Sequence, residues 1–203
     1  MTIVDEYADL IDVLVEDQSH FDTRYVKDLD EVSRIVAAIR RRGDKKIVLT
    51  SGSFDVIHEG HSMYLEAARL MGDFLVVGVD SDEKVRQRKG PTRPAVPEQE
   101  RLRMVTHQRG VGLVTLKHPE HERWALIKVV RPDILVATEE TYTDAEIAEL
   151  EHLYCGKVEV LRRMATVSTS NRLRKTYFEL ASVLEERLPN FLRQVVSEIA
   201  GVQ

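Results

Sequence analysis

Short apolar runs alternate along most of this chain with longer stretches in which apolar residues recur every three or four positions. The short runs are continuous, as in Phe74–Val77, and continuous runs are typical of strands covered on both faces. Strands are predicted at 47–50, 74–79, 111–116, 134–138 and 157–161. Helices are predicted between them at 61–71, 82–88, 97–108, 119–130 and 144–154. This alternation predicts an α/β fold with a doubly wound, five-stranded parallel sheet.

Residues typical of helix ends support several of these boundaries. Pro97 and Pro119 are each followed by acidic residues, which is a good pattern for the first turn of a helix. Thr143 can cap the helix that Gly156 ends. Ligands of such sheets bind beyond the carboxyl ends of the strands, where the winding direction reverses. The loop after the first strand therefore lies at the expected binding site.

Helical extensions are predicted at both ends of the chain. Residues 3–17 have the spacing of a short amphipathic helix, and 18–26 have the composition of a linker. A further helix from Asp28 ends at Gly43, with Arg40, Arg41 and Arg42 in its last turn.

The apolar spacing after Ser170 predicts a long amphipathic helix that is broken at Pro189 and followed by a short one to about Ile199. The expected domains are an N-terminal extension (1–26), a central domain (27–174) and a C-terminal extension (175–203).

The stretch TSGSFDVIHEGH at residues 50–61 carries the strongest chemical signal. It follows the first strand and leads into a helix, and Gly60 lies between His58 and His61. A helix start offers unpaired N–H groups and a partial positive charge, and imidazoles there add donors for an anion. The pattern favours a polyphosphate site. Two readings stay open at this point, a partial metal site and a purely structural turn.

Composition narrows the class of protein. The 203 residues, 43% of them hydrophobic, suffice for one substantial core. A net charge of −5 argues against nonspecific nucleic-acid binding, and the single cysteine, Cys155, excludes an internal disulfide and suits a reducing compartment. The N-terminal stretch is acidic and has no long apolar span. A soluble, cytoplasmic protein without membrane or nucleic-acid partners is expected.

Four segments of the chain resemble the nucleotidyltransferase superfamily that includes the cytidylyltransferases and the heptose-phosphate adenylyltransferases. The first, SGSFDVIHEGH, resembles the signature T-x-G-x-F-D-x-x-H-x-G-H. The others are GDFLVVGVDSDE, KGPTRPAVPEQER and RMATVSTS, in family order and spacing, and the resemblance covers Lys27 to about Arg174. Class I aminoacyl-tRNA synthetases share HxGH, but this chain is too short for one and has no KMSKS. The resemblance implies a Rossmann-like HxGH nucleotidyltransferase fold.

The resemblance also implies roles for individual residues. His58, His61 and Lys89 are the implied catalytic residues. The implied nucleotide-binding residues are Thr50, Ser51, Gly52, Ser53, Phe54, Asp55, Gly60, Arg101, Arg163, Ser168, Thr169 and Ser170. Asp55 would orient the first loop or help to place Mg²⁺, and Arg101 and Arg163 would clamp phosphates. Asp80, by its position in the fold, and Arg93 are assigned to the acceptor, and no residue is assigned as a protein ligand of a metal.

The implied reaction transfers CMP or AMP from CTP or ATP to a small phosphorylated acceptor such as a sugar or polyol phosphate, with Mg²⁺ carried by the triphosphate. A flavin- or pantetheine-type adenylyltransferase and a non-catalytic nucleotide-binding module are the alternatives, and a homodimer is possible. The chain departs from the family pattern twice. Residues 137–142 replace a Gly-Asp pair, and Leu173 replaces an arginine, with Arg172 and Arg174 beside it.

Overall fold

A computed structural model describes residues 7, 15, 20–162, 164 and 169–201 of the chain. Its contacts divide the chain into two compact units, Met1–Thr166 and Val167–Gln203. The predicted helix at 3–17 lies almost entirely outside the described residues. The predicted domain limits after residues 26 and 174 stay predictions.

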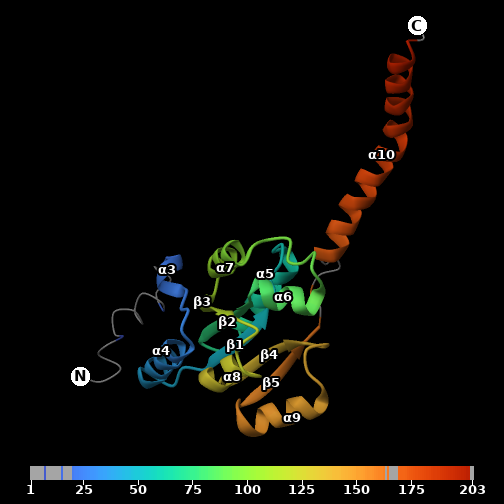
Figure 1. Ribbon diagram of the computed structural model, residues 1–203. Coiled ribbons are helices and arrows are strands. Elements are labelled where there is room, and N and C mark those ends of the chain that lie inside the picture. Colours follow the sequence, from blue (N-terminus) through green and yellow to red (C-terminus); the bar gives the residue numbers. More distant parts are fainter. Residues whose placement is uncertain (1–6, 8–14, 16–19, 163, 165–168, 202–203) are drawn as a thin grey trace. The chain divides into compact units, whose positions relative to one another are not determined.

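The first unit is built on a parallel sheet of five strands in the order β3-β2-β1-β4-β5 (Figure 1). The strands are β1 (Ile47–Gly52), β2 (Phe74–Asp80), β3 (Val111–Lys117), β4 (Ile134–Thr138) and β5 (Lys157–Leu161). All five predicted strands are confirmed. The chain leaves β1 for β2 and β3 on one side and then returns to β4 on the other side of β1. The predicted doubly wound, Rossmann-like α/β fold is therefore confirmed, and its winding reverses at β1.

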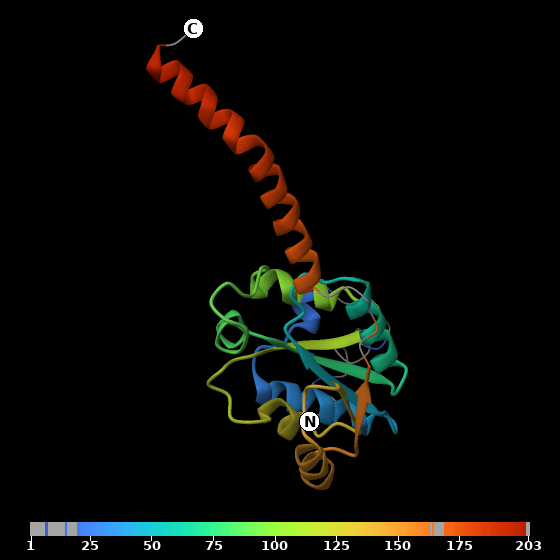
Figure 2. The same cartoon turned by 90° about the vertical axis from the view of Figure 1, so that its right-hand side faces the viewer.

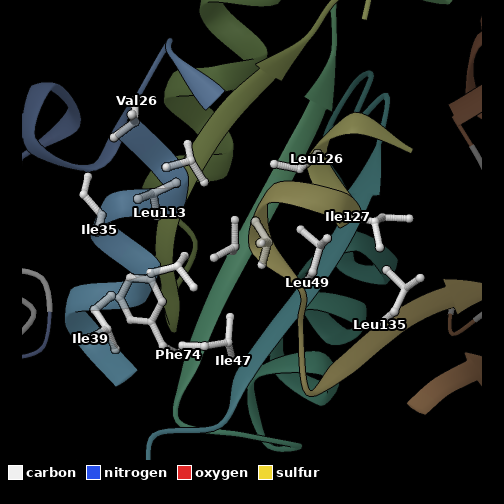
Figure 3. Packing of buried hydrophobic residues seen from close by; sticks show 14 of the residues in the cluster. Val26, Ile35, Ile39, Ile47, Leu49, Phe74, Leu113, Leu126, Ile127 and Leu135 are labelled. Atoms are coloured by element: carbon white, nitrogen blue, oxygen red, sulfur yellow. The ribbon is translucent and has the colours of Figure 1, made fainter. Parts of the chain in front are cut away.

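Helices cover both faces of the sheet (Figure 2). They are α4 (Leu29–Arg41), α5 (Glu59–Arg69), α6 (Asp82–Lys89), α7 (Glu98–Thr106), α8 (Ala125–Val130) and α9 (Asp144–Leu153). Apolar side chains of α4, α8 and α9 pack with Ile47, Leu49 and Leu113 in one core (Figure 3). Those of α5 and α7 pack with Val48, Val77 and Val114 in a second core. The continuous apolar runs of the strands thus reflect burial on both faces.

The capping predicted for α4 is present. Asp28 accepts a hydrogen bond from the backbone N–H of Glu31 at 2.8 Å. At the other end, the Arg40 guanidinium donates to the carbonyls of Val130 and Arg131, at 3.0 and 2.7 Å. These two carbonyls lie at the end of α8, so Arg40 ties the ends of two helices on one face together.

The predicted linker at 18–26 is wrong for its described part. The short helix α3 (Phe21–Arg24) lies there, and Phe21, Arg24 and Val26 are buried. The backbone N–H of Val26 donates to the Val114 carbonyl at 2.9 Å, which attaches the segment to β3. A four-residue helix contains little more than one turn, so it leaves no periodic signal in the sequence.

The predicted helix at 119–130 begins later than expected, at Ala125. Trp124 precedes it in the left-handed region with φ 63°, which cannot continue a right-handed helix. The backbone N–H of His118 donates to His121 Nδ1 at 3.4 Å, so Pro119 and the acidic residues after it belong to a turn.

Within the described part of the second unit, residues 169–201, the chain forms the helix α10 (Thr169–Ala200). The predicted break at Pro189 is wrong, since this proline lies inside the helix. Exposed apolar side chains follow one another along it at Tyr177, Leu180, Leu184 and Leu188. Among the described helices, none has a stretch of sufficient length and apolarity to cross a membrane.

Candidate active site

The two histidines of the HEGH stretch form the first turn of α5. His58 is the N-cap, and its Nδ1 accepts a hydrogen bond from the backbone N–H of Gly60 at 3.1 Å. His61 Nδ1 accepts from the backbone N–H of His58 at 3.3 Å, and the two ring centroids are 4.1 Å apart. Because both Nδ1 atoms are acceptors, each neutral ring carries its proton on Nε2. The helix start therefore carries two imidazoles that are protonated on Nε2, in addition to its own backbone N–H groups.

His61 is held in its neutral form. Its pKa is lowered to about 4, first by burial and then by the neighbouring His58 and Lys89, while Asp55 acts in the opposite direction. A neutral imidazole still donates from Nε2. An anion placed against it would favour the protonated ring and strengthen the contact.

The loop between β1 and α5 contains two non-glycine residues with positive φ, Phe54 at 48° and Val56 at 52°. Such conformations cost energy and persist where the surroundings impose them. The buried Phe54 ring lies 5.6 Å from the His61 ring, centroid to centroid. A Cβ on Gly52 would stand 3.2 Å from the same Phe54 ring, so a larger residue at 52 would crowd it. The aromatic ring thus fixes one side of the His61 imidazole.

Thr50 forms hydrogen bonds that connect neighbouring elements of the fold. Its buried hydroxyl donates to the Val136 carbonyl at 3.0 Å and lies 2.7 Å from the Tyr64 hydroxyl. Burial raises the pKa of Tyr64 to about 12, so this phenol stays neutral. The two hydroxyls tie β1 and α5 to β4, on both sides of the point where the winding reverses. Ser51 follows Thr50 on β1.

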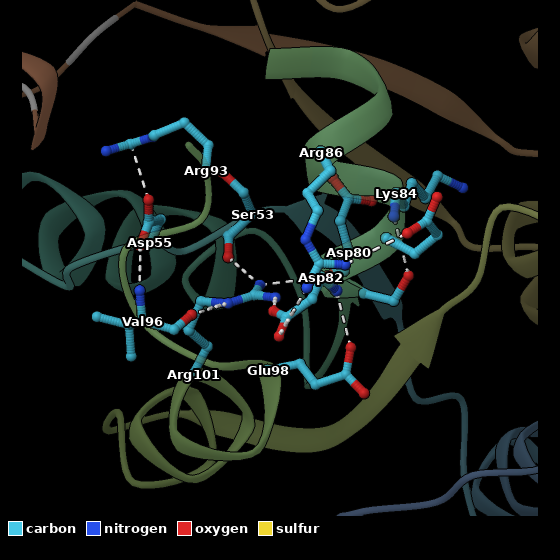
Figure 4. A network of polar contacts seen from close by, with 12 residues as sticks. Ser53, Asp55, Asp80, Asp82, Lys84, Arg86, Arg93, Val96, Glu98 and Arg101 are labelled. Atoms are coloured by element: carbon cyan, nitrogen blue, oxygen red, sulfur yellow. Dashed lines mark hydrogen bonds and ion pairs between the residues drawn. The ribbon is translucent and has the colours of Figure 1, made fainter. Parts of the chain in front are cut away.

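Asp55 joins the first loop to the loop between α6 and α7 (Figure 4). Its carboxylate, 2% exposed, accepts hydrogen bonds from the backbone N–H groups of Ala95 and Val96, each at 3.0 Å. Arg93 forms an ion pair with it at 2.8 Å. Of the two roles expected for Asp55, these contacts favour the orientation of a loop. Arg93, expected at the acceptor, is directed to this carboxylate.

Arg101 lies at the centre of the same network and is 1% exposed (Figure 4). Its guanidinium donates to the Val96 and Asp80 carbonyls, at 2.9 and 2.8 Å, to the Ser53 carbonyl and to the Asp82 carboxylate. The structure thus places its donors on protein acceptors, which differs from the phosphate clamp expected from the sequence. The reason is a set of acceptors on three separate segments of the chain, which sequence spacing does not reveal.

Lys89 reaches the first loop from the end of α6. Its Nζ donates to Ser53 Oγ at 2.9 Å. Its pKa is lowered by burial and by the neighbouring Arg88 and Arg93. The side chain thus lies close enough to His61 for each charge to affect the other. His58, His61 and Lys89, the three implied catalytic residues, are brought to one place.

A family profile with the description cytidylyltransferase-like matches residues 49–182. The chain belongs to the cytidylyltransferase-like family. It is 46% identical over 110 residues to the bifunctional protein HldE of Desulfatibacillum aliphaticivorans, covering 54% of this chain and 22% of that protein. It is 38% identical over 171 residues to HldE of Methylobacillus flagellatus, covering 83% of this chain and 34% of that protein. The chain thus spans only about a third of these relatives or less.

Solved structures give the same picture of the cytidylyltransferase-like fold. The lipopolysaccharide core biosynthesis protein of Thermoplasma volcanium superposes with a TM-score of 0.51 at 28% identity, over 61% of this chain and 99% of that one. Pantoate-beta-alanine ligase of Francisella tularensis superposes with a TM-score of 0.52 at 13% identity, over 72% of this chain and 68% of that one. The second likeness concerns the fold alone.

Part of the implied cytidylyltransferase-like site remains a prediction. Arg163 and Ser168 lie outside the described residues, and the side chains of Thr169 and Ser170, at the start of α10, are not described either. The same holds for Leu173 and its neighbouring arginines. The second phosphate motif therefore rests on the sequence.

The stretch that replaces the family's Gly-Asp pair is a turn after β4. The Thr141 hydroxyl accepts from the backbone N–H of Thr138 at 3.2 Å, and Glu139 lies 3.8 Å from Arg162. Tyr142 packs against the core, and burial first of all raises its pKa to about 12. This wall of the cytidylyltransferase-like domain thus combines a neutral phenol with carboxylates.

Two charged residues that surround Asp80 were not identified from the sequence. Lys117 and Arg88 form ion pairs with the buried Asp80 carboxylate, at 3.5 and 2.9 Å. Lys117 is the last residue of β3, at the same edge of the sheet as Asp80. The rule that selected Asp80, a polar residue at the carboxyl end of a strand, would also have selected Lys117.

Proposed function

We propose that the chain transfers a nucleotidyl group, CMP or AMP, from a nucleoside triphosphate to the phosphate of a small sugar or polyol phosphate, with release of pyrophosphate. The observation that carries this proposal is the pair of imidazoles on the first turn of α5. Both Nδ1 atoms accept from backbone N–H groups, so each neutral ring carries its proton on Nε2. Membership in the cytidylyltransferase-like family supports the same reaction.

In this reaction an oxygen of the acceptor phosphate attacks the α-phosphorus. A new P–O bond forms as the bond from the α-phosphorus to the bridging oxygen breaks, and pyrophosphate leaves with that electron pair. The acceptor phosphate is already anionic, so no strong base is required. His58, His61 and the start of α5 hold the triphosphate and stabilise the charge that develops on it, and Lys89 neutralises charge at the α-phosphate.

Mg²⁺ is expected to arrive with the triphosphate. Within the described part of the chain, no three His, Cys, Asp or Glu residues lie close enough together to hold a metal ion. The Asp55 carboxylate is engaged by two backbone N–H groups and Arg93. Such a site fits an ion held mainly by phosphate oxygens and water, as Mg²⁺ usually is beside nucleotides. The ion would neutralise part of the triphosphate charge.

The choice of acceptor rests on the relatives. HldE proteins of two bacteria and a lipopolysaccharide core biosynthesis protein are similar to this chain, and its motifs resemble the heptose-phosphate adenylyltransferases. A sugar phosphate is therefore the proposed acceptor. The chain covers 34% of the HldE protein of Methylobacillus flagellatus. The comparison therefore applies to one part of that protein.

The proposal is tested by pyrophosphate release in the presence of Mg²⁺. CTP and ATP are each combined with glycerol phosphate, a hexose 1-phosphate and a heptose 1-phosphate, and the His58→Ala/His61→Ala double variant is the control. Turnover by the wild type and loss of turnover in the variant are expected. Absence of turnover with every pair, together with undiminished nucleotide binding by the double variant, would contradict the proposal and favour a non-catalytic binding module.

Triphosphate binding is expected to take up a proton at His61. Its pKa of about 4 in the free protein should rise beside phosphate oxygens, and a group whose pKa rises on binding makes the affinity stronger at lower pH. The affinity should therefore increase as the pH falls from about 7.5 to about 5.5. Calorimetry in two buffers with different enthalpies of protonation measures the uptake. The His61→Ala variant accounts for titration of the triphosphate itself, and equal uptake by both proteins would contradict the prediction.

Replacing Lys89 by methionine should reduce turnover by about 10- to 100-fold and change the Kd for the triphosphate less than about threefold. The aliphatic part is kept, and the lost ammonium acts mainly where charge grows during transfer. Single-turnover rates and equilibrium binding separate the two effects. The matched control is Lys45→Met, at an exposed ion pair with Asp73, which should leave both unchanged. A loss of binding without a loss of rate would make Lys89 a simple electrostatic contact.

A further inference from the structure

Asp80 and Lys117 end two neighbouring strands at the edge of the sheet where the first loop begins. They are register partners in β2 and β3, and their side chains therefore lie on the same face. The Asp80 carboxylate is 2% exposed, and its Oδ1 lies 3.5 Å from Lys117 Nζ. On the other side, Asp80 Oδ2 pairs with Arg88 at 2.9 Å. Figure 4 shows Asp80 beside the network of Arg101.

The lack of a side chain at Gly78 leaves room for Lys117 to lie over β2. A Cβ on Gly78 would stand 2.6 Å from Lys117 Cδ and 2.8 Å from Ser51 Oγ. Both distances are too short for a real side chain, so the lysine can lie across β2 at this point only because residue 78 is glycine. The aliphatic part of Lys117 thus lies over β2, and its ammonium group pairs with Asp80 on the same strand.

Two buried oxygens on this face accept or donate no hydrogen bond among the described residues. They are Asp80 Oδ1 and Thr115 Oγ1, and Thr115 is the register partner of Gly78, one row deeper in the sheet than Lys117. Their residues are 1% and 0% exposed. Buried polar atoms that form no hydrogen bond are costly and rare in folded proteins, even where an ion-pair partner lies close by, as Lys117 does to Asp80 Oδ1. The Asp80 oxygen, which lies 3.5 Å from the Lys117 ammonium, indicates a place for a ligand that can donate a hydrogen bond.

The charge of the cluster restricts the ligand. Arg88 and Lys117 both form ion pairs with the Asp80 carboxylate. Burial first of all lowers the pKa of Lys117, and the nearby Lys84 and Arg88 lower it further. Cations therefore outnumber the carboxylate here. A cationic group, such as the ammonium of a phosphorylated amino alcohol, would meet an excess of positive charge there. An alkyl group would offer the Asp80 oxygen no hydrogen-bond donor. A hydroxyl group satisfies both Asp80 and Lys117, because it donates to the carboxylate and accepts from the ammonium.

We infer that Asp80 and Lys117 form the subsite that recognises hydroxyl groups of the acceptor, and that Lys117 is a specificity-determining residue. This inference rests on the proposed function. In this arrangement the acceptor phosphate lies between His61 and Lys89, and its polyol part extends toward the Asp80 and Lys117 side chains at the strand ends. The subsite selects polyhydroxylated phosphates over alkyl phosphates and over phosphates that carry an amine.

The test compares wild type with Lys117→Met, which keeps the aliphatic chain over Gly78 and removes the ammonium. The acceptors are the hydroxylated phosphate that the wild type uses best, propyl phosphate and O-phosphoethanolamine. For the variant we expect a KM for the hydroxylated acceptor raised by about 10-fold or more, and a KM for the triphosphate changed less than about twofold. The preference for the hydroxylated acceptor over propyl phosphate should fall by a similar factor.

Two controls accompany this variant. Lys117→Gln keeps an N–H donor and should recover part of the preference, and Lys45→Met, at an ion pair outside the site, should change nothing. An unchanged preference in a folded Lys117→Met variant would overturn the subsite, and so would an equal rise in KM for acceptor and triphosphate. Absence of turnover by the wild type with every acceptor would instead overturn the proposed function, and the subsite with it.

Discussion

Replacing His61 by alanine is expected to lower turnover by on the order of 10²-fold or more. The imidazole is held from three sides. Its Nδ1 accepts from the His58 backbone, its ring contacts His58, and Phe54 lies 5.6 Å away, so its Nε2 donor is fixed before substrate arrives. A donor that needs no reorganisation contributes most where negative charge grows during transfer, and removing one such donor costs about this factor.

Steady-state pyrophosphate release measures this loss, and a thermal unfolding curve shows whether the variant is folded. The His61 ring also caps α5, so a cost of about 0.5–2 kcal/mol in stability is expected as well. His107→Ala is the matched control, because that histidine ends α7 at the surface. A turnover within a fewfold of wild type would show that α5 holds the triphosphate without this ring.

Replacing Arg101 by methionine should reduce the free energy of unfolding by about 3–5 kcal/mol. The variant leaves the carbonyls of Ser53, Asp80 and Val96 without their donor inside the protein. The Asp82 carboxylate would lose its partner as well. Removing one side of a buried charged network costs more than the network contributed, because the remaining groups stay desolvated.

Chemical denaturation of the free protein measures this effect. The control is Arg86→Met, an exposed arginine near Asp82 and Glu83 on α6, for which a change within about 0.5 kcal/mol is expected. The result also separates two roles. If Arg101 binds phosphate, as the sequence suggests, the variant should keep its stability and lose nucleotide affinity. The buried network requires the opposite.

The sheet could be predicted from the sequence because strands that are buried on both faces have continuous apolar runs, such as Phe74–Val77. His58 and His61 could be placed for a similar reason, since a helix start is a local feature. Arg101 could not, because its acceptors come from residues 53, 80, 82 and 96, and only the folded chain brings them together. The late start of α8 depends on the left-handed backbone of Trp124. A tryptophan in the sequence gives no indication of this conformation, which is uncommon for residues other than glycine.

The contact of Asp55 with Ala95, Val96 and Arg93 has a consequence for protein engineering. Residue 55 and the segment from 93 to 96 contact each other directly and depend on each other, although some forty positions separate them in the chain. An exchange of the Lys89–Val96 segment with that of a relative, made to alter acceptor choice, must therefore transplant residue 55 with it. A graft limited to the segment would leave the buried Asp55 carboxylate without matching hydrogen-bond donors and without its arginine.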